Sequence, residues 1–400
     1  MSVAQTKRAY KYRFYPTDEQ KKILAQTFGC TRFVYNWGLS TRKIAYFQHG
    51  QSLYYNDLAA MLPNLKQQYP WLADVSSVPL QQALRHLDRA FVNFFEGRAD
   101  YPVFKKKHKE QSATYASNAF TWDGKALTLA KMDAPLAIRF HRPLPKGCKP
   151  SSVTITKDRA NRYFVSILVA EVISPLPVTP KMVGLDLGIQ SMVALSTGES
   201  VGNPRYFAKD ERKLAKAQRK LAHKKKGSKN RAKARLKVAK IHAKIADRRR
   251  DYQHKLSTRI VYENQVVCVE SLAVKNMVKN HCLAKAIVDV GWGEFTRQLD
   301  YKAKWYGRTL VKIDRWYPSS KTCHACKHVL DSLSLDIREW ICPACGVVHD
   351  RDTNAALNIL AVGLTVTACG GNVRRDEVRA RHAVPIEAGN SGREVRSPRL

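Results

Sequence analysis

Residues 182–189 read Met-Val-Gly-Leu-Asp-Leu-Gly-Ile, an apolar run interrupted by one carboxylate, Asp186. A short run of this kind is typical of a strand that is buried on both faces. Because a carboxylate inside a buried strand is costly unless it is paired or binds a metal ion, Asp186 is expected to have such a partner. The next residues, SMVALSTGESV (191–201), predict the neighbouring strand of a hairpin.

Two further acids stand in comparable positions. Gln265–Leu272 predicts a second buried strand that ends at Glu270, and residues 350–359 predict an amphipathic helix that begins with Asp350 and Asp352. Each acid alone also fits a structural role, since carboxylates cap helices and complement helix dipoles. We choose Asp352 as the third acid because Asp352 and Asn354 form an Asp-x-Asn pair at the helix start, and we expect Asp350 to cap the helix.

Acids on two strands and a following helix predict an RNase H-like layout. Such folds gather carboxylates that hold two divalent ions roughly 3.5 to 4 Å apart for phosphodiester cleavage. Hard oxygen ligands favour Mg²⁺ or Mn²⁺. The sequence therefore predicts a nuclease site at Asp186, Glu270 and Asp352, with these side chains as the metal ligands.

Two C-x₂-C pairs predict one structural zinc ion. They are separated by 15 residues and consist of Cys323, Cys326, Cys342 and Cys345. Four thiolates close a tetrahedral coordination sphere and leave no position for water. Gly346 supplies a permissive turn after the second pair. His324, His328 and His349 offer alternative ligands, although four cysteines suffice.

The charge balance predicts a polyanionic partner. The chain has 400 residues and a mass of 45.4 kDa, with 69 Lys and Arg against 33 Asp and Glu and a formal charge of +36. No apolar run is as long as a membrane span and the first residues lack a signal-peptide core, so we expect an intracellular, cytoplasmic protein that associates with nucleic acid in the nucleoid. A secreted scaffold, a membrane protein and a disordered chain are disfavoured.

Half of this excess charge falls in residues 205–259, where 22 Lys or Arg accompany 4 Asp or Glu. Apolar residues at spacings near 3.5 predict two helices, and Gly227 and Ser228 mark the turn between them. Few acidic partners are available to neutralise the hairpin, so we expect it to contact phosphates. The residues expected to bind nucleic acid are Lys224, Lys225, Lys226, Lys229, Arg231 and Arg235 of this hairpin, together with Lys105, Lys106 and Lys107.

The first half of the chain combines strands and helices. Tyr10, Tyr12 and Phe14 alternate with basic residues, which predicts a half-buried strand, and Thr17–Gln20 forms a capping box that opens a helical block. Strand patterns follow between residues 111 and 175, and with the first strand they are expected to form a barrel. A proline-rich linker at 173–180 separates this half from the second, and residues 365–400 are expected to be a disordered tail.

With these motifs in place, the chain resembles the TnpB family of transposon-encoded RNA-guided endonucleases, relatives of type V CRISPR effectors. The resemblance covers residues 7–369. It rests on YKYRFYPTDEQ (10–20), CTRFVYNWGL (30–39), YPVFKKK (101–107), IRFHRPLP (138–145), GLDLGI (184–189), VCVESL (267–272), the two C-x₂-C pairs, HDRDTNAALNIL (349–360) and GLTVTACG (363–370).

The resemblance implies a bilobed, multidomain α+β and α/β protein. Its domains would be a β-barrel wedge domain (1–16 and 102–178), a helical recognition domain (17–101), a RuvC-like nuclease domain (179–314 and 350–364) that carries the hairpin at 205–260, and a zinc ribbon (315–349). It also implies that Asp186, Glu270 and Asp352 are the RuvC acidic triad. Motif reading in this family falls to the helical and wedge domains, which makes Gln81, Gln82 and Arg85 candidates, although an exposed polar helix face explains them equally well.

The implied partners are a guide RNA from the transposon end and double-stranded target DNA that carries a short adjacent motif. An A-form heteroduplex is held through its backbone, which agrees with the basic composition. The oligomeric state stays open, with a monomer bound to RNA as the working expectation. The alternatives are a guided DNA-binding repressor with an inactive nuclease and an unguided RuvC-like nuclease. All three acids are present, which argues against an inactive repressor. The helical block would have no clear use in an unguided nuclease.

Overall fold

The computed structural model describes residues 5–334 and 336–368. The chain divides into two compact units. Of the described residues, 5–176 and 204–256 form the first unit, and 177–203, 257–334 and 336–368 form the second. Within the described ranges, no helix is long and apolar enough to cross a membrane.

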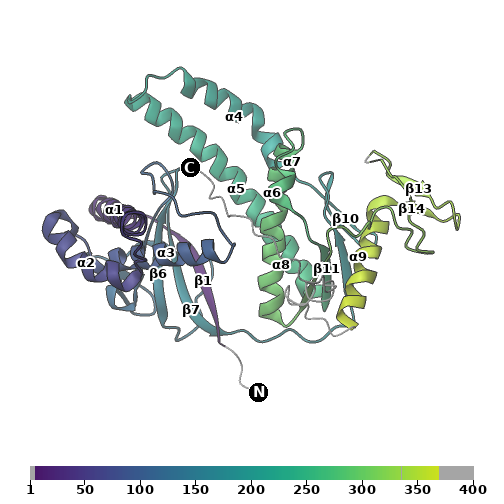
Figure 1. Cartoon of the computed structure of the whole chain (residues 1–400), viewed down its shortest axis with the longest axis horizontal. Coiled ribbons are helices and arrows are strands. Elements are labelled where there is room, and N and C mark those ends of the chain that lie inside the picture. Colours follow the sequence, from purple (N-terminus) through teal and green to yellow (C-terminus); the bar gives the residue numbers. More distant parts are fainter. Residues whose placement is uncertain (1–4, 335, 369–400) are drawn as a thin grey trace, which may run out of the picture. The chain divides into compact units, whose positions relative to one another are not determined.

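The first unit is built on an antiparallel five-stranded sheet with the order β2-β6-β7-β1-β5. Figure 1 labels β1, β6 and β7 of this sheet. The strands are β1 (Gln5–Phe14), β2 (Gln111–Ala116), β5 (Ile138–Arg139), β6 (Pro150–Lys157) and β7 (Tyr163–Val172), and β3 (Phe120–Trp122) pairs with β4 (Leu127–Leu129) as a separate two-stranded sheet. Tyr10, Tyr12 and Phe14 are buried while their basic neighbours face outward. The alternation read from the sequence is therefore confirmed, because successive strand side chains point to opposite faces.

The barrel expected from these strands is not shown. Among the described residues, the pairing leaves β2 and β5 as the two edges of an open sheet. β5 contributes only two paired residues, Ile138 and Arg139. So short a strand offers too few hydrogen-bonding groups to extend the sheet toward closure.

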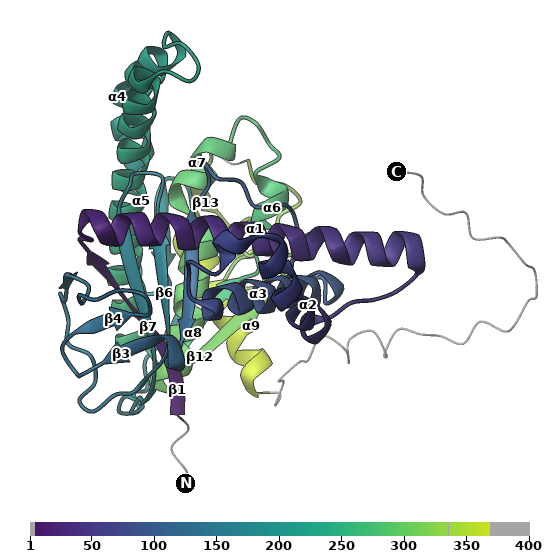
Figure 2. The same ribbon diagram turned by 90° about the vertical axis from the view of Figure 1, so that its left-hand side faces the viewer.

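The helical block of the first unit starts at the predicted capping box. Thr17 accepts from the Gln20 backbone N–H, and the Gln20 side chain accepts from the Thr17 backbone N–H. The helix α1 (Asp18–His49) then runs without a break until Gly50, which has a φ of 62°. α3 (Ser77–Phe95) packs against both α1 and α2 (Tyr55–Gln68), and η1 (Pro70–Leu72) joins α2 to α3 (Figure 2).

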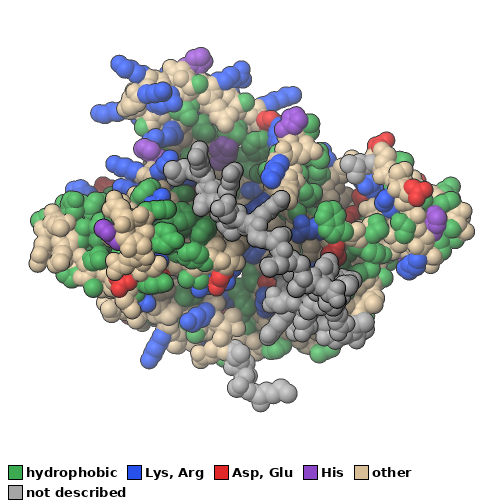
Figure 3. Space-filling view, in the orientation of Figure 1, with side chains coloured by type: hydrophobic (Ala, Val, Ile, Leu, Met, Phe, Trp, Pro, Cys, Tyr) green, Lys and Arg blue, Asp and Glu red, His purple; other side chains and the backbone are tan. Residues whose placement is uncertain are grey.

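The basic segment forms the predicted helical hairpin. α4 (Tyr206–Ala222) and α5 (Lys229–Glu263) meet along a small apolar seam in which Leu214 and Ala217 pack against Ile241 and Ile245. Gly227, with a φ of 84°, allows the turn. Lys and Arg side chains project from the hairpin into solvent (Figure 3).

The second unit contains a mixed five-stranded sheet with the order β10-β9-β8-β11-β12. Its strands are β8 (Met182–Asp186), β9 (Ser191–Leu195), β10 (Ser200–Gly202), β11 (Val266–Glu270) and β12 (Thr309–Ile313). β8, β11 and β12 run parallel, whereas β9 and β10 are antiparallel to their neighbours. The hairpin partner predicted after Asp186 is therefore confirmed as β9.

In the described part of the second unit, four further helices and a small hairpin accompany this sheet and the end of α5. They are α6 (Val274–Met277), α7 (Ala284–Val290), α8 (Trp292–Tyr306), the β13 (Glu339–Ile341) and β14 (Val348–Asp350) pair, and α9 (Arg351–Ala368). α9 packs against β8 and β11, and Figure 1 shows it beside β11. Of the stretch expected to be a tail, residues 365–368 belong to α9 and residues 369–400 lie outside the described residues.

Candidate functional site

Asp186 and Glu270 end two adjacent parallel strands. In the register of β8 and β11, Leu185 lies opposite Val269, so the next residue of each strand is one of the two acids. The two carboxyl groups are close enough for each to act on the pKa of the other, and the Leu187 backbone also acts on Glu270. The carboxyl ends of parallel strands form one edge of the sheet, which is where ligands bind in open α/β sheets.

Burial shifts the pKa values of these two acids. Burial raises the pKa of Asp186 well above its usual range, and the neighbouring charges of Glu270 and Asp352 raise it further. Burial also raises the pKa of Glu270. Both shifts disfavour two ionised carboxylates side by side, and a divalent cation would offset that cost.

The third acid comes from the start of α9. Asp352 is close enough for its charge to act on Asp186. Its two carboxylate oxygens each accept from Arg338 Nη1 at 3.3 Å, and its side chain is 27% exposed. The structure thus gathers Asp186, Glu270 and Asp352, from two strands and one helix, at the same end of the sheet.

Asp350 has the capping role expected for it. Its Oδ1 accepts from the Thr353 backbone N–H at 2.7 Å, which satisfies one of the free N–H groups in the first turn of α9. An Asp at this position caps the helix, whereas Asp352 lies one residue inside it.

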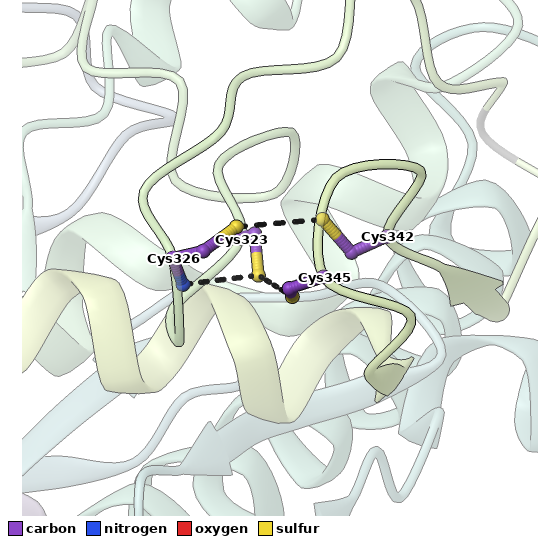
Figure 4. Close-up of side chains that lie close together, drawn as sticks. All are labelled: Cys323, Cys326, Cys342 and Cys345. Atoms are coloured by element: carbon purple, nitrogen blue, oxygen red, sulfur yellow. Dashed lines mark hydrogen bonds between the residues drawn. The ribbon is translucent and has the colours of Figure 1, made fainter.

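The four predicted cysteines form one cluster (Figure 4). Their sulfur atoms all lie within 4.8 Å of one another, with Cys323 Sγ 3.7 Å from Cys345 Sγ and Cys326 Sγ 3.6 Å from Cys342 Sγ. A tetrahedral zinc ion with Zn–S bonds near 2.3 Å places its sulfurs about 3.8 Å apart. The spacing of this cluster therefore fits a metal ion held by four thiolates.

Each cysteine pair occupies a tight turn of the backbone. The Cys326 N–H points at Cys323 Sγ at 3.5 Å, and Gly346 follows the second pair with a φ of 71°. Gly346 therefore has the conformation that the sequence predicts. Lys327 occupies the equivalent place after the first pair with a φ of 67°, a left-handed conformation that its identity does not indicate.

Of the three histidines considered as ligands, His349 lies nearest to the cluster. Its Nε2 is 3.0 Å from Cys323 Sγ, and the residue is only 4% exposed. His324 lies beside it, with the two ring centres 5.4 Å apart. His349 therefore lies against a sulfur atom of a cluster that already supplies four ligand atoms.

A basic groove lies in the first unit. It has a volume of about 1440 Å³ and is lined by the 103–112 segment, the β6–β7 turn and the outer face of α5. Eleven Lys or Arg and three Asp or Glu line it. The cations therefore outnumber the acids, and two of these acids, Asp158 and Asp247, are already in ion pairs with Arg162. Such a surface attracts phosphates.

The groove joins residues that the sequence places far apart. Lys105, Lys106 and Lys107 come from one wall and Arg235 from α5 on the other. Asn36 fixes the first wall, since its amide donates to the Lys105 carbonyl at 3.0 Å and accepts from the Lys105 N–H at 2.7 Å. Burial lowers the pKa of Lys105.

The other residues expected to bind nucleic acid are placed differently. Lys224, Lys225, Lys226 and Lys229 are exposed around the tip of the hairpin. The Arg231 guanidinium donates to the Leu221 and Lys224 carbonyls, so it caps the end of α4. On α3, Gln81 and Arg85 are exposed and Gln82 is half-buried, with the Arg85 guanidinium 4.3 Å from the centre of the Tyr55 ring.

Sequence reasoning missed several residues around these sites. Arg338, which contacts Asp352, lies between the cysteine pairs and carries no local signal. Lys11 and Arg250 line the groove from β1 and α5 and become neighbours only through the fold. Asn354 and Asn358 had a readable signal, because two amides at i and i+4 interrupt the apolar face of a predicted helix.

Comparisons with known proteins agree on one group of relatives. The description "Probable transposase" (OrfB_IS605) matches residues 165–281, "Cas12f1-like, TNB domain" matches residues 292–359, and "Helix-turn-helix domain" (HTH_OrfB_IS605) matches residues 1–51.

Full-length relatives are similar along nearly the whole chain. A Streptomyces pristinaespiralis protein named "Putative RNA-guided DNA endonuclease" is 53% identical over 380 residues, which cover 94% of each protein. The Escherichia coli K12 protein "Putative RNA-guided DNA endonuclease InsQ" is 31% identical and covers 92% of this chain and 95% of its own. A solved Cas12f1–sgRNA–target DNA complex covers 89% of this chain and 98% of its own with a TM-score of 0.54. Its identity of 13% makes this a likeness of fold alone.

Proposed function

The chain belongs to the TnpB family, and from this premise we propose that it is an RNA-guided DNA endonuclease that hydrolyses phosphodiester bonds at Asp186, Glu270 and Asp352. One observation carries the proposal. Three acids from β8, β11 and α9 lie together at one sheet edge, in a chain 53% identical to a protein named as such an endonuclease. The RNase H-like, RuvC type of nuclease domain is supported by the strand order β10-β9-β8-β11-β12.

We assign the divalent ions to the three carboxylates. Oxygen ligands of this kind suit Mg²⁺ or Mn²⁺, and two such ions would activate water and stabilise the leaving oxygen. The role of the chain is to hold the ligands in place. Asp186 and Glu270 are fixed by the strand ends, and divalent cations, when bound, would favour the ionised form of both carboxyl groups. Arg338 balances the charge of Asp352 until then.

The cysteine cluster is assigned to one structural zinc ion. Cys323, Cys326, Cys342 and Cys345 fill a tetrahedron with sulfur, so no position is open for substrate. Its role would be to hold residues 315–349 in a ribbon, because the small cluster of Trp340, Leu330 and Leu333 beside the cysteines is too little core to stabilise so short a segment.

The guide RNA and the target DNA are assigned to the basic surfaces. The groove of the first unit, with Lys105, Lys106, Lys107 and Arg235 in its walls, suits the sugar-phosphate backbone of an RNA stem or an RNA–DNA heteroduplex. The exposed lysines at the tip of the hairpin extend this surface. Gln81, Gln82 and Arg85 of α3 are proposed to face the adjacent motif in duplex DNA.

The domain organisation follows the family. We propose a wedge domain at 1–16 and 102–178, a recognition domain at 17–101, a nuclease domain at 179–314 and 350–364, and a ribbon at 315–349. Inside a cell, this protein would work in the cytoplasm on nucleoid DNA, as one chain with one RNA.

The decisive experiment is to sequence the RNA that co-purifies with the protein. That RNA is then combined with Mg²⁺ and a DNA library that contains its complement beside randomised flanking bases. We expect one discrete RNA species and cutting only of complementary DNA with a defined flanking motif. Random RNA with cutting of any DNA would indicate an unguided nuclease, and guided binding without cutting would indicate a repressor. Either result would overturn the proposal.

A further inference from the structure

Two asparagines connect helix α9 to the first cysteine turn. Asn354 and Asn358 lie one helical turn apart and are 1% and 0% exposed. Asn354 Nδ2 donates to the Thr322 carbonyl at 2.8 Å and to the Ser319 carbonyl at 3.5 Å. Asn358 Nδ2 donates to the same two carbonyls, at 2.6 and 3.0 Å. Both partners are acceptors, so each amide must present its NH₂ group to them.

The other end of the Asn354 amide holds the far side of the same turn. Its Oδ1 accepts from the His324 backbone N–H at 3.0 Å. Thr322 and His324 flank Cys323 in the sequence, so one side chain of α9 binds the backbone on both sides of a cysteine in the cluster. Together with Asn358, it fixes the position of this turn along the helix.

Packing alone does not explain these amides. The neighbouring residues of α9, Ala355, Ala356 and Ile359, are all fully buried and apolar. Asn358 Oδ1 is buried without a hydrogen-bond partner among the described residues, so it carries an uncompensated desolvation cost. An apolar side chain would fill this space without that penalty, so the amides fit a role that needs their donors.

The helix that carries the asparagines also carries the third acid. Asp352 lies two residues before Asn354, in the first turn of α9. We propose that Asn354 and Asn358 are positioning residues through which the metal-bound cysteine turn fixes the start of α9, and thereby sets Asp352 against Asp186 and Glu270. A zinc ion held by the four cysteines would affect the reaction indirectly, because it would make rigid the turn that the asparagines hold.

This inference rests on the proposed role of Asp352 as a ligand of the catalytic ions. We call the hydrogen bonds of Asn354 and Asn358 to Ser319, Thr322 and His324 the clamp. The inference predicts that weakening the clamp changes how well those ions bind, whereas a purely structural role for the asparagines would change only the amount of folded protein. The clamp therefore has a readout other than stability.

The test uses Asn354→Asp in the full-length protein. The new carboxylate still accepts from the His324 N–H but places an oxygen against the Thr322 carbonyl, so it repels the turn that it should hold. Three quantities are measured: zinc per chain, Mn²⁺ affinity by titration calorimetry on protein freed of RNA, and the Mg²⁺ concentration for half-maximal single-turnover cleavage by the RNA complex. We expect about one zinc per chain, as in the unaltered protein, Mn²⁺ affinity about tenfold weaker, and a Mg²⁺ midpoint raised by a similar factor.

Two further variants keep the result decisive. Asn358→Ala removes one pair of donors without adding charge and should shift both metal readouts in the same direction by a smaller factor. Asn264→Asp is the matched control, since Asn264 is a buried asparagine of the same unit that donates to the Ile260 carbonyl at 2.9 Å, away from α9. Its metal readouts should stay at the level of the unaltered protein. Unchanged Mn²⁺ affinity and Mg²⁺ midpoint in folded Asn354→Asp and Asn358→Ala would overturn the clamp.

Failure of the clamp and failure of the proposed function give different results. If Asp352→Ala cuts DNA with an unchanged Mg²⁺ midpoint, Asp352 is not a metal ligand and the proposed site is wrong. If Asp352→Ala is inactive but the asparagine variants have normal metal readouts, the site stands and the clamp is wrong.

Discussion

A β-carbon built on Gly184 would lie 2.0 Å from the backbone oxygen of Ala356 and 2.8 Å from the backbone nitrogen of Leu360. Strand β8 and helix α9 are therefore in direct backbone contact, which only glycine permits. A β-carbon on Gly363 would likewise lie 2.3 Å from Cys268 Sγ in β11. These two contacts dock α9 on the strands that carry Asp186 and Glu270, and so determine where Asp352 can lie.

The Gly184→Ala substitution tests this docking. Its methyl group meets backbone atoms, which cannot rotate away, so α9 must move off the strand. We expect a loss of about 1–3 kcal/mol in the free energy of unfolding and a larger loss of cleavage than of RNA binding. Gly293→Ala in α8 is the control, because its β-carbon meets no atom within 4 Å and alanine favours a helix. If Gly184→Ala unfolds and cuts DNA like the unaltered protein, the contact between β8 and α9 is dispensable.

Asp350 and Asp352 offer a second test, since they are two residues apart and have different roles. Asp352→Asn removes a proposed ligand charge and should reduce single-turnover cleavage at least about a hundredfold with RNA binding intact. Asp350→Ala removes the cap and should lower the free energy of unfolding by about 1 kcal/mol while cutting continues. Denaturant unfolding and cleavage of a matched DNA measure the two effects. If Asp350→Ala abolished cutting and Asp352→Asn only lowered the free energy of unfolding, Asp350 would be the metal ligand and Asp352 the cap.

The parts of the site that depend on local chemistry could be predicted from the sequence. Asp186 stands out because a carboxylate in an apolar strand needs a partner, and the cysteine pairs stand out because metal ligands need fixed spacing. The capping box at Thr17 and the alternation at Tyr10 and Tyr12 are local in the same way. In each case the residues that carry the signal are neighbours along the chain.

Features that arise from contacts between distant segments could not be predicted. Lys105 and Arg235 line one groove only because the fold brings α5 to the 103–112 segment. Arg231 has the same local signal as its basic neighbours, yet it caps α4. The barrel expectation also depended on long-range pairing, which the two-residue β5 does not extend.

Lys302 predicts a pH dependence of stability. Burial lowers the pKa of this lysine from 10.5 to about 8, and its Nζ donates to Ser257 and Thr258 at 2.7 Å. Between pH 8 and 10.5 the unfolded chain binds more protons at this site than the folded chain does, so the free energy of unfolding gains a contribution that rises with pH. Below pH 8 both states are protonated and the contribution is constant.

The Lys302→Met variant isolates this contribution. The free energy of unfolding of this variant minus that of the unaltered protein should be largest at neutral pH. This difference should shrink as the pH rises from 8 toward 10. Urea unfolding at pH 7, 8, 9 and 10 measures the difference. Lys304→Met, on the exposed side of the same helix, is the control and should show a constant difference. A constant difference for Lys302→Met would refute the burial effect.

The cysteine cluster predicts the metal content. Purified protein should carry about one zinc per chain, and Cys326→Ser should reduce this because three thiolates and a hydroxyl bind zinc more weakly. Elemental analysis gives the stoichiometry. Cys282→Ser is the control, because Cys282 is exposed and lies outside the cluster. A zinc-free protein with native cleavage would contradict the assignment.

The basic groove makes a quantitative prediction for RNA binding. Each phosphate contact contributes a slope of about 0.7 to 0.9 to the dependence of log affinity on log salt concentration. Lys107→Ala with Arg235→Ala removes one cation from each wall and should lower the magnitude of the slope by up to about two. Lys125→Ala with Lys131→Ala removes the same charge from exposed positions outside the groove and should leave the slope unchanged. Equal losses in the two double variants would mean that total charge holds the RNA, and a lower slope only for the first pair would locate its phosphates in the groove.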